Sequence, residues 1–375
     1  MSELKEYKLN ELYVMSSGIS SSKNQAGSGY PFVSFRDIFN NTFLPENLTE
    51  LMNTSDTDRI KYSVKKGDVF ITRTSETPDE LAMSSVALKD YPNATFSGFA
   101  KRLRPIDNKK VYDKYMAFYF RSKYFRKIVN ANTIMTLRAS FNEEIFSYIK
   151  IQIPDYDTQV KIGDMLYKIE KKILINNQIN NNLEELAYSI FLQRFTKKIL
   201  NGTIGDIIKE NEKSKIKVSD AKTVKGKYPF FTSGESILEW NDYLVEGRNL
   251  FFNTGGNADV KYYVGKAMYS TDTWCVTTNG DFSDYLYLYF KSIRGELDRK
   301  FFHGSGLKHL QKDLLKQEKI YIPEKEEISQ FNILLRPMFD IISENKIENQ
   351  RLKSLKEFIL PLLMNGQINV DDIEI

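Results

Sequence analysis

The chain has few of the residues on which enzyme active sites commonly depend. Its 375 residues include one cysteine, Cys275, and two histidines, His303 and His309. A single cysteine cannot form an internal disulfide, which predicts a reducing compartment such as the cytoplasm. So few histidine and cysteine ligands also argue against a structural zinc site. No nucleophile with a base and an orienting group is visible around either histidine, so we expect no histidine-dependent catalysis.

Several sequence motifs are absent as well. Gly265-Lys266 is followed by alanine, so there is no phosphate-binding loop, and the dinucleotide-binding, nucleophile-elbow and zinc-protease motifs do not occur. The Asn/Asp-Pro-Pro-aromatic tetrapeptide of amino-methyltransferases is missing too. No apolar run reaches the roughly 18 residues of a transmembrane helix, and the polar start at residues 1–6 predicts no secretory signal. We therefore expect no membrane partner.

The sequence contains an internal repeat, which is the feature to establish first. Five segments recur in the same order: Tyr30-Pro31-Phe32 with Tyr228-Pro229-Phe230, residues 67–74 with 247–254, 115–122 with 285–292, Ile151-Gln152-Ile153-Pro154 with Ile320-Tyr321-Ile322-Pro323, and 200–204 with 364–368. Their offsets fall steadily from 198 to 164 residues, which indicates longer loops in the first copy. The conserved order predicts a duplication in which each copy is a globular part followed by a helical part.

The globular parts are predicted to be mixed α/β. Val69-Phe70-Ile71 and Leu250-Phe251-Phe252 are short apolar runs opened by glycine turns, as buried strands are. The aromatic-rich residues 115–126 and 285–291 fit either a helix or a strand, and Cys275 lies in an apolar context typical of a core. The predicted division is a first domain over 1–153, a first spacer helix over 154–201, a second domain over 202–322, and a second helix with a tail over 323–375.

The helical parts show heptad spacing, which predicts a coiled coil. Position a is expected at Ile162, Ile169, Asn176, Leu183 and Ile190, and at Phe331, Met338, Asn345, Leu352 and Ile359. Position d is expected at Met165, Ile179 and Leu186, and at Leu334, Ile341, Leu355 and Leu362, with Lys172 and Glu348 as exceptions. Two such helices of about 40 residues would each be roughly 60 Å long and would space the globular parts at a fixed distance.

Asn176 and Asn345 both occupy the central a position of their helices. A buried asparagine at this position costs stability but fixes the register of a helix pair. If the helices run antiparallel about a pseudo-twofold axis, equivalent central residues meet near that axis. We therefore predict that these two amides lie close together there. The alternative is that both are polar breaks that face solvent in a loose seam.

These features together resemble a known family. The chain resembles the specificity subunit of type I restriction-modification systems in the order of its motifs. These are a Tyr-Pro-aromatic segment, a Gly-Asp-apolar strand ending at Thr72-Arg73-Thr74, an Ile-x-Ile-Pro segment and a long helix, all of them repeated. Ser270-Thr271-Asp272 in the second copy adds to the likeness, which covers essentially the whole chain. The resemblance implies an α+β fold, in which two target-recognition domains are joined and spaced by two long antiparallel coiled-coil helices with pseudo-twofold symmetry.

The resemblance also implies a function and partners. Each domain would read one half of a bipartite, asymmetric site in double-stranded DNA, and the helices would set the spacer. Two methyltransferase (modification) subunits would dock on the helices, and restriction (motor-nuclease) subunits would join the assembly. The chain itself would be non-catalytic and would bind no cofactor, with S-adenosylmethionine, ATP and magnesium on the partner subunits.

The two copies differ where the family often carries a glycine-rich loop. The first copy has residues 73–79, Arg-Thr-Ser-Glu-Thr-Pro-Asp, whereas the second copy keeps Thr254-Gly255-Gly256-Asn257. The copies are therefore expected to present different loops to DNA. Arg36, Arg73 and Arg138 are candidates for base contacts, because arginine can donate two hydrogen bonds to guanine. The remaining candidate DNA contacts are Ser75, Lys101, Arg102, Lys225, Lys227, Asn257, Lys261, Lys308 and His309.

The charge is unevenly distributed over the chain. The total of +4 is the sum of +5 over residues 1–153, 0 over 154–197, +3 over 198–322 and −4 over 323–375. Lys101-Arg102-Leu103-Arg104 and the six lysines within residues 213–227 are the densest basic clusters. Positive charge therefore concentrates on the globular copies, where phosphate contacts would be needed.

Two other functions remain open from the sequence. Pro78-Asp79 followed by Asp107-Asn108-Lys109 fits the loose pattern of metal-dependent nucleases, although the second copy lacks an equivalent. A scaffold of two binding modules spaced by a coiled coil would have the same architecture without DNA as a ligand. Magnesium-dependent cleavage would identify the first alternative, and the absence of salt-dependent DNA binding would identify the second.

Overall fold

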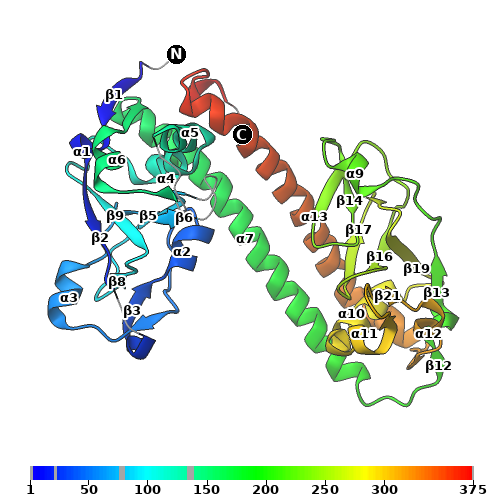
Figure 1. Ribbon diagram of the computed structural model, residues 1–375. Helices are drawn as coiled ribbons and strands as arrows, with labels where there is room; N and C mark the ends of the chain where they lie inside the picture. The colour runs from blue at the N-terminus through cyan, green and yellow to red at the C-terminus, as the bar shows by residue number, and fades with distance from the viewer. Residues whose placement is uncertain (1–2, 21–22, 76–80, 133–138, 374–375) are drawn as a thin grey trace. The chain divides into compact units, whose positions relative to one another are not determined.

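The computed structural model describes residues 3–20, 23–75, 81–132 and 139–373. The chain forms two compact units, one made of Met1–Lys172 with Leu352–Ile375 and the other of Ile173–Arg351. Each unit contains one globular part and portions of the two long helices, α7 (Tyr156–Phe195) and α13 (Lys325–Met364), which are labelled in Figure 1. No described helix is long and apolar enough to span a membrane.

The first globular part is built on a four-stranded antiparallel sheet in the order β2-β9-β5-β7. A smaller sheet has the order β4-β3-β8, in which β3 and β8 are parallel, and two further pairs are β1-β11 and β6-β10. The strands are β1 (Lys5–Lys8), β2 (Tyr13–Ser17), β3 (Ala26–Val33), β4 (Leu51–Met52), β5 (Val69–Thr72), β6 (Thr74–Ser75), β7 (Ser84–Val86), β8 (Thr95–Phe96), β9 (Ala100–Pro105), β10 (Ala139–Ser140) and β11 (Lys150–Ile153). The helices are α1 (Leu9–Leu12), α2 (Phe35–Asn40), α3 (Asp56–Lys61), α4 (Asp113–Arg121), α5 (Lys123–Ala131) and α6 (Glu143–Tyr148), with a 3₁₀ turn η1 (Lys23–Gln25).

The second globular part repeats this topology. Its four-stranded sheet has the order β13-β19-β16-β17. Its smaller sheet has the order β15-β14-β18, in which β14 and β18 are parallel, and two further strand pairs are β12-β22 and β20-β21. The strands are β12 (Gly202–Thr203), β13 (Ile208–Glu210), β14 (Tyr228–Phe231), β15 (Ile237–Trp240), β16 (Arg248–Asn253), β17 (Val260–Val264), β18 (Met268–Tyr269), β19 (Thr273–Thr278), β20 (Phe302–His303), β21 (His309–Leu310) and β22 (Lys319–Ile320). The helices are α8 (Ile204–Ile207), α9 (Val218–Ala221), α10 (Ser283–Ser292), α11 (Arg294–Phe301) and α12 (Lys312–Lys316), and a turn η3 (Val370–Asp372) follows α13.

The strand ladders confirm the predicted duplication and correct its alignment by one residue. Thr72 pairs with Ala100 at the end of one ladder, and Asn253 pairs with Thr273 at the same place in the other. Thr72 therefore corresponds to Asn253, whereas the sequence match of residues 67–74 with 247–254 aligned it with Phe252. The glycine in the turn before the strand lies one residue closer to the strand in the first copy than in the second. Matching the two glycines therefore shifted the alignment of the strands by one residue.

Aromatic side chains from the predicted strands fill the core of each copy. Phe70 of β5 packs edge-on against Phe96 at 5.1 Å between ring centroids, and Phe251 of β16 stacks on Phe231 at 4.0 Å. Each such buried phenylalanine contributes about 1.5–3 kcal/mol through removal of its surface from water. The two buried runs are strands as predicted, and Cys275 is 2% exposed in the core of the second copy.

The aromatic-rich segments are helices. In α4, all residues from Tyr115 to Phe120 are buried, and α10 buries Tyr285, Leu286, Leu288 and Phe290. Gly163 of α7 lies against the start of α4, where an added Cβ would stand 2.6 Å from the Tyr115 backbone nitrogen. The glycine thus permits the close packing that attaches α7 to the first copy.

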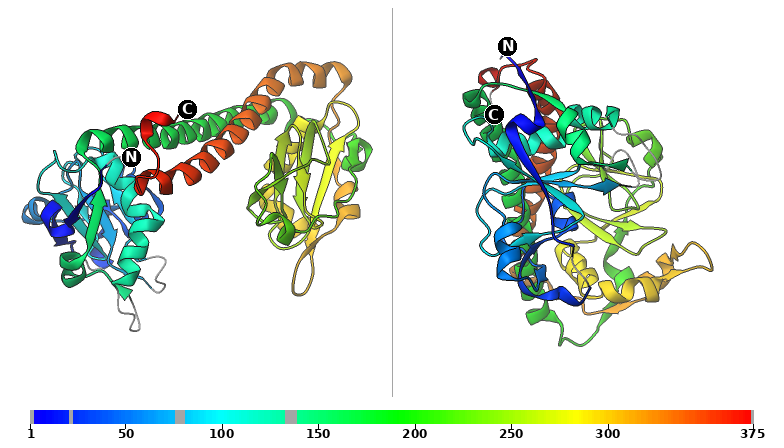
Figure 2. Two further views of the ribbon diagram at one scale, coloured as in Figure 1. Left: turned by 90° about the horizontal axis from the view of Figure 1, so that it is seen from above. Right: turned by 60° about the vertical axis from the view of Figure 1, so that its left-hand side comes forward.

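Within each unit, α7 and α13 pack together and run antiparallel. Glu170 accepts a hydrogen bond from Lys356 at 2.6 Å in one unit, and Asn180 accepts one from Asn345 at 2.8 Å in the other. As the residue number rises along α7, the number of its partner on α13 falls, which defines an antiparallel pair. Figure 2 shows the start of α7 in green beside the end of α13 in red from two further directions.

The predicted helix seam is confirmed at position a and only in part at position d. The predicted a line is buried or half-buried on both helices. Of the predicted d residues, Met165, Leu355 and Leu362 are half-buried, whereas Ile179, Leu186, Leu334 and Ile341 are exposed. The second buried line lies one residue later in each heptad, at Leu166, Ile173, Asn180 and Ala187 of α7 and at Leu335, Ile342, Asn349 and Leu363 of α13. This shift explains Lys172 and Glu348, which were exceptions only because the d line was misassigned.

The two central asparagines each bond to a different asparagine. Asn176 donates to the Asn349 Oδ1 atom at 2.9 Å, and Asn345 donates to the Asn180 Oδ1 atom at 2.8 Å. In the duplication, Asn176 corresponds to Asn345 and Asn180 to Asn349. The two bonds are therefore equivalent by a local twofold relation. That these amides fix the register stays a prediction.

Candidate nucleic-acid interface

Each globular copy brings two distant loops together, and we call these paired loops the loop edge. In the first copy, residues 73–75 lie beside residues 139–144, where β6 pairs with β10 and the Phe141 N–H donates to the Arg73 carbonyl at 2.8 Å. In the second copy, residues 254–257 lie beside residues 308–313, and the Leu310 N–H donates to the Thr254 carbonyl at 3.0 Å. Gly255 and His309 form the equivalent bridge. The backbone scaffold of the loop edge is therefore the same in both copies.

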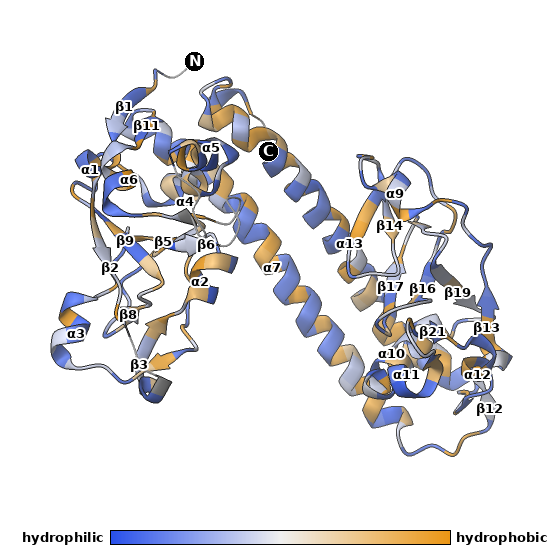
Figure 3. Cartoon of the chain, in the orientation of Figure 1, coloured by the Kyte–Doolittle hydropathy of each residue, from blue (hydrophilic) through white to orange (hydrophobic). Residues whose placement is uncertain are grey.

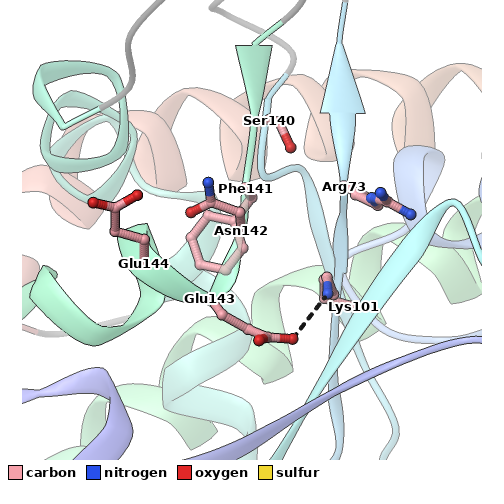
Figure 4. Close-up of a pocket in the computed structure, with 7 residues that line it drawn as sticks. All are labelled: Arg73, Lys101, Ser140, Phe141, Asn142, Glu143 and Glu144. Atoms are coloured by element: carbon pink, nitrogen blue, oxygen red, sulfur yellow. Dashed lines mark ion pairs between the residues drawn. The ribbon is translucent and has the colours of Figure 1, made fainter.

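The loop edge of the first copy surrounds an open hollow of about 270 Å³, shown in Figure 4. The hollow is lined by Arg73, Lys101, Ser140, Phe141, Asn142, Glu143 and Glu144. Arg73 is exposed and, among the residues that the structure describes, its guanidinium forms no ion pair. Figure 4 shows Glu143 directed toward Lys101 and Glu144 directed away from it.

Lys101 fixes one wall of this hollow. Its side chain is largely buried, and its ammonium donates to the Ser17 Oγ atom at 2.8 Å and lies 3.7 Å from the Glu143 carboxylate. Asn142 begins α6 by accepting a hydrogen bond from the Ile145 N–H at 2.9 Å. This cap orients the first turn of α6, from which Glu143 and Glu144 extend.

The second copy fills the same position with an indole ring. Trp274 corresponds to Lys101 in the ladders, and its Nε1 atom donates to Glu210 at 2.7 Å. The Lys312 ammonium lies 5.0 Å from the centroid of the Trp274 ring, a cation–π contact. Lys316 hydrogen-bonds to Glu210, and this bond, together with the one from Trp274, lowers the pKa of the Glu210 carboxyl. The second loop edge therefore carries Lys312 over a buried aromatic ring, whereas the first carries Arg73 and two exposed carboxylates.

Two of the predicted DNA contacts, Arg102 and Lys261, have side chains that bond inside the first and second copies. Arg102 is 8% exposed, and its guanidinium donates to the Ser63 carbonyl at 2.5 Å; burial lowers the pKa of this side chain. Lys261 donates to the Thr232 carbonyl at 3.1 Å and to the Asn253 Oδ1 atom at 3.0 Å, and burial lowers its pKa too. Both cations satisfy internal carbonyl groups, so neither can reach a phosphate in this conformation.

The other described candidates have exposed side chains. Arg36 lies on α2, and Lys225 and Lys227 precede β14, with the Lys227 ammonium 5.5 Å from the Tyr228 ring centroid. Asn257, Lys308 and His309 lie on the second loop edge, where Lys308 is paired with Asp298 at 2.5 Å. The structure thus brings together Arg73 with Lys101, and Asn257 with Lys308 and His309, while Arg36 lies on a separate helix. Arg138 and the side chain of Ser75 lie outside the described residues.

The sequence did not single out several side chains that line the loop edges. Asn142, Glu143, Trp274 and Lys312 were not among the candidates. The duplication could have identified these residues. Residues 139–144 and 308–313 lie at equivalent places in the two copies, next to the candidates Arg138 and His309. Aligning these two stretches would have shown that Glu143 corresponds to Lys312.

The described residues offer little for metal chemistry. No group of three or more His, Cys, Asp or Glu side chains among them is arranged to hold a metal ion. The proline and aspartate of the nuclease-like pattern, Pro78-Asp79, lie outside the described residues, and Asp107 accepts the Lys109 N–H at 2.8 Å. Burial raises the pKa of the Cys275 thiol to about 12, so this cysteine is a protonated core residue at neutral pH.

Comparison with known proteins identifies the family. The type I restriction modification DNA specificity domain matches twice, at residues 1–185 and 197–357. The chain belongs to this family. The two matches coincide with the two copies, so the chain is a type I specificity subunit with two target-recognition domains.

Individual relatives support the assignment. The chain is 21% identical to the type I restriction enzyme MjaIX specificity subunit of Methanocaldococcus jannaschii, over 94% of this chain and 89% of that protein. It is 29% identical to the HindI specificity subunit of Haemophilus influenzae, over 52% of this chain and 41% of that protein. The crystal structure of a type I S subunit from M. genitalium has the same fold, with a TM-score of 0.65, 12% identity and 96% of each chain covered.

Proposed function

We propose that each globular copy of this specificity subunit reads one half of a bipartite, asymmetric site in double-stranded DNA. The observation that carries the proposal is the loop edge, where one backbone arrangement displays different side chains in the two copies. Base readout depends on side-chain donors and acceptors, so two copies with one scaffold and different groups are suited to two different half-sites.

Phosphate contacts would come from lysines outside the hollow. The stretch from Lys213 to Lys227 contains six lysines, all with exposed side chains, around α9 and the start of β14. Such contacts orient a protein on DNA and supply most of the salt-dependent affinity. The stretch therefore supports DNA binding by the second copy without contributing sequence preference.

The long helices carry the second half of the proposed function. Four predicted d residues leave an apolar row on the helix surfaces: Ile179 and Leu186 are exposed on α7, and Leu334 and Ile341 are exposed on α13. Ile175 of α7 is exposed as well. Figure 3 shows the apolar segments along both helices in orange. We propose that two methyltransferase subunits dock on the helices, that restriction subunits join them, and that the helix length sets the unread spacer in the DNA.

The chemistry would then belong to the partners. The chain would act as a non-catalytic subunit in the cytoplasm, with S-adenosylmethionine, ATP and magnesium bound by the modification and restriction subunits. The buried, protonated Cys275 is compatible with a reducing compartment.

Selection of DNA from a random pool tests the proposed function. The full chain with its modification subunits should enrich sequences with two short conserved segments separated by unread positions. The affinity should fall steeply as salt rises, because phosphate contacts release counterions. A pool that shows no enrichment, or binding that is indifferent to salt, would support the scaffold alternative. DNA cleavage by the chain alone with magnesium would support the nuclease alternative.

A further inference from the structure

The hollow of the first loop edge combines a cation, a carboxylate and an open volume. The exposed guanidinium of Arg73 stands on one side, and Glu143, whose side chain is 84% exposed, stands on the other. Lys101 lies at 3.7 Å from the Glu143 carboxylate and holds it toward the hollow, as Figure 4 shows. A donor group and an acceptor group therefore line one space.

Phosphate is a poor ligand for this hollow. Glu143 and Glu144 are both exposed, and their negative charges would repel a phosphate placed near Arg73. The ammonium of Lys101 lies beside the Glu143 carboxylate, so these two charges largely cancel and Lys101 adds little net attraction for a phosphate. A neutral base edge that presents both acceptors and a donor fits the same groups without this cost.

The carboxylates are also not explained by helix stability alone. Acidic residues do favour the first turn of a helix, and Glu143 opens α6. In the second copy, however, the equivalent helix α12 opens with Lys312 at the corresponding position. The fold therefore tolerates a cation at this place, and the carboxylate of the first copy calls for another explanation.

We propose that this hollow reads the major-groove edge of one G·C base pair in the half-site bound by the first copy. Arg73 donates to the O6 and N7 atoms of guanine, and the Glu143 carboxylate accepts from the N4 amino group of cytosine. Lys101 is a positioning residue that holds the carboxylate. This inference rests on the proposed function, because it names one base pair within a site that the function requires.

The test uses the full chain with its modification subunits and a random DNA pool, whose enriched sequences are compared between variants. Arg73→Ala and Glu143→Ala should each relax the same single G·C position of one half-site by about tenfold to a hundredfold. Arg73→Lys keeps the charge but loses the two-pronged donor, so it should relax that position as well. The other half-site should stay unchanged in all three variants.

Glu50→Ala is the matched control, since it removes the same charge from an exposed side chain of the first copy that does not line the hollow. It should leave the preference at every position intact. Circular dichroism and thermal unfolding should match the unsubstituted chain, because the replaced side chains are exposed.

Three results would overturn the inference alone: an even loss of affinity over all sequences in the Arg73 variants, a Glu143→Ala profile identical to that of the Glu50→Ala control, or relaxation at an A·T pair. If the unsubstituted complex enriches no two-part sequence, the proposed function fails and this inference fails with it.

Discussion

The two loop edges share a backbone and differ in their side chains. The Phe141 N–H and the Leu310 N–H donate to equivalent carbonyls, so the loops are held in the same way. Around them, Arg73, Lys101 and Glu143 of the first copy correspond to Thr254, Trp274 and Lys312 of the second. Strand pairing therefore supplies the scaffold, while a few side chains at its edge differ between the copies.

A second contrast lies inside the four-stranded sheets. In the first copy, the buried Asp68 carboxylate accepts two hydrogen bonds from Arg104, at 2.7 and 2.6 Å. The second copy has Asn249 and Thr277 at these positions. The Asp68 side chain and the Asn249 side chain bond to the same turn, at Lys65 and Glu246 respectively. One copy thus uses a buried ion pair where the other uses neutral groups.

Breaking that ion pair should produce the largest effect. Arg104→Ala leaves the buried Asp68 carboxylate without its partner and should destabilise the first copy by about 3–5 kcal/mol. Thr277→Ala, the matched change in the second copy, removes one hydrogen bond and should cost about 1 kcal/mol. Chemical denaturation monitored by hydrogen exchange separates the two copies. The double variant Asp68→Asn with Arg104→Thr should recover most of the loss, and no recovery would show that the copies are not interchangeable here.

The asparagine pairs of the helices should come next. Asn176→Leu leaves the buried Asn349 Oδ1 atom without its donor, although the Asn349 amide still donates to Asn177, and should cost about 1–3 kcal/mol. A double-mutant cycle with Asn349→Leu should show a coupling energy of about 0.5–3 kcal/mol. The equivalent cycle between Asn180 and Asn345 should give a similar value, because the two bonds are related by the duplication.

The control cycle combines Asn176→Leu with Asn345→Leu, two residues that each bond to a different asparagine. Its coupling should be close to zero. Strong coupling in this cycle, with none between Asn176 and Asn349, would favour a direct Asn176–Asn345 pair instead.

The sequence predicted the duplication, the buried strands and one line of the helix seam. It did not predict the second line, because Ile179 and Leu186 are apolar but face solvent, and apolar spacing alone does not say which of two adjacent rows meets the partner helix. Lys172 at a predicted d position indicated the error, since burying a charged residue in a helix seam costs free energy.

The burial of the candidate DNA contacts could not be predicted from the sequence. Arg102 and Lys261 sit on strands whose neighbours bury them, and a basic residue in a sequence carries no mark of that burial. Glu143 was overlooked because carboxylates are not expected at a DNA interface. Arg73 was placed correctly at the end of a strand, since a buried apolar run followed by a polar loop fixes where the side chain emerges.

Removing lysines of the second copy should separate phosphate contacts from base contacts. Lys225→Ala with Lys227→Ala should lower the slope of log affinity against log salt by up to about 2, and should weaken binding evenly over all sequences. Arg73→Ala should change the sequence preference instead. Titrations at several salt concentrations give the slopes. A sequence-specific loss in the lysine variant would mean that this stretch contacts bases.

The smallest expected effect depends on pH and concerns the second copy alone. The bonds from Lys316 and Trp274 lower the pKa of Glu210 in the folded state. The stabilisation is therefore present above the ordinary glutamate pKa of about 4.3 and is lost as the pH falls below it. Because both partners are partly exposed, the effect should be less than about 1 kcal/mol. Unfolding between pH 3 and 6 should show this loss in the unsubstituted chain, whereas a Glu210→Gln variant with the same loss would exclude this carboxyl as its source.

Mapping the methylated positions in DNA exposed to the reconstituted complex tests the central claim most directly. The account predicts one asymmetric site of two conserved segments with a fixed unread spacer, and it predicts that changes at Arg73 alter one segment while leaving the other intact. A single uninterrupted recognition sequence, or a change at Arg73 that alters both segments together, would contradict the claim that the two copies read DNA independently.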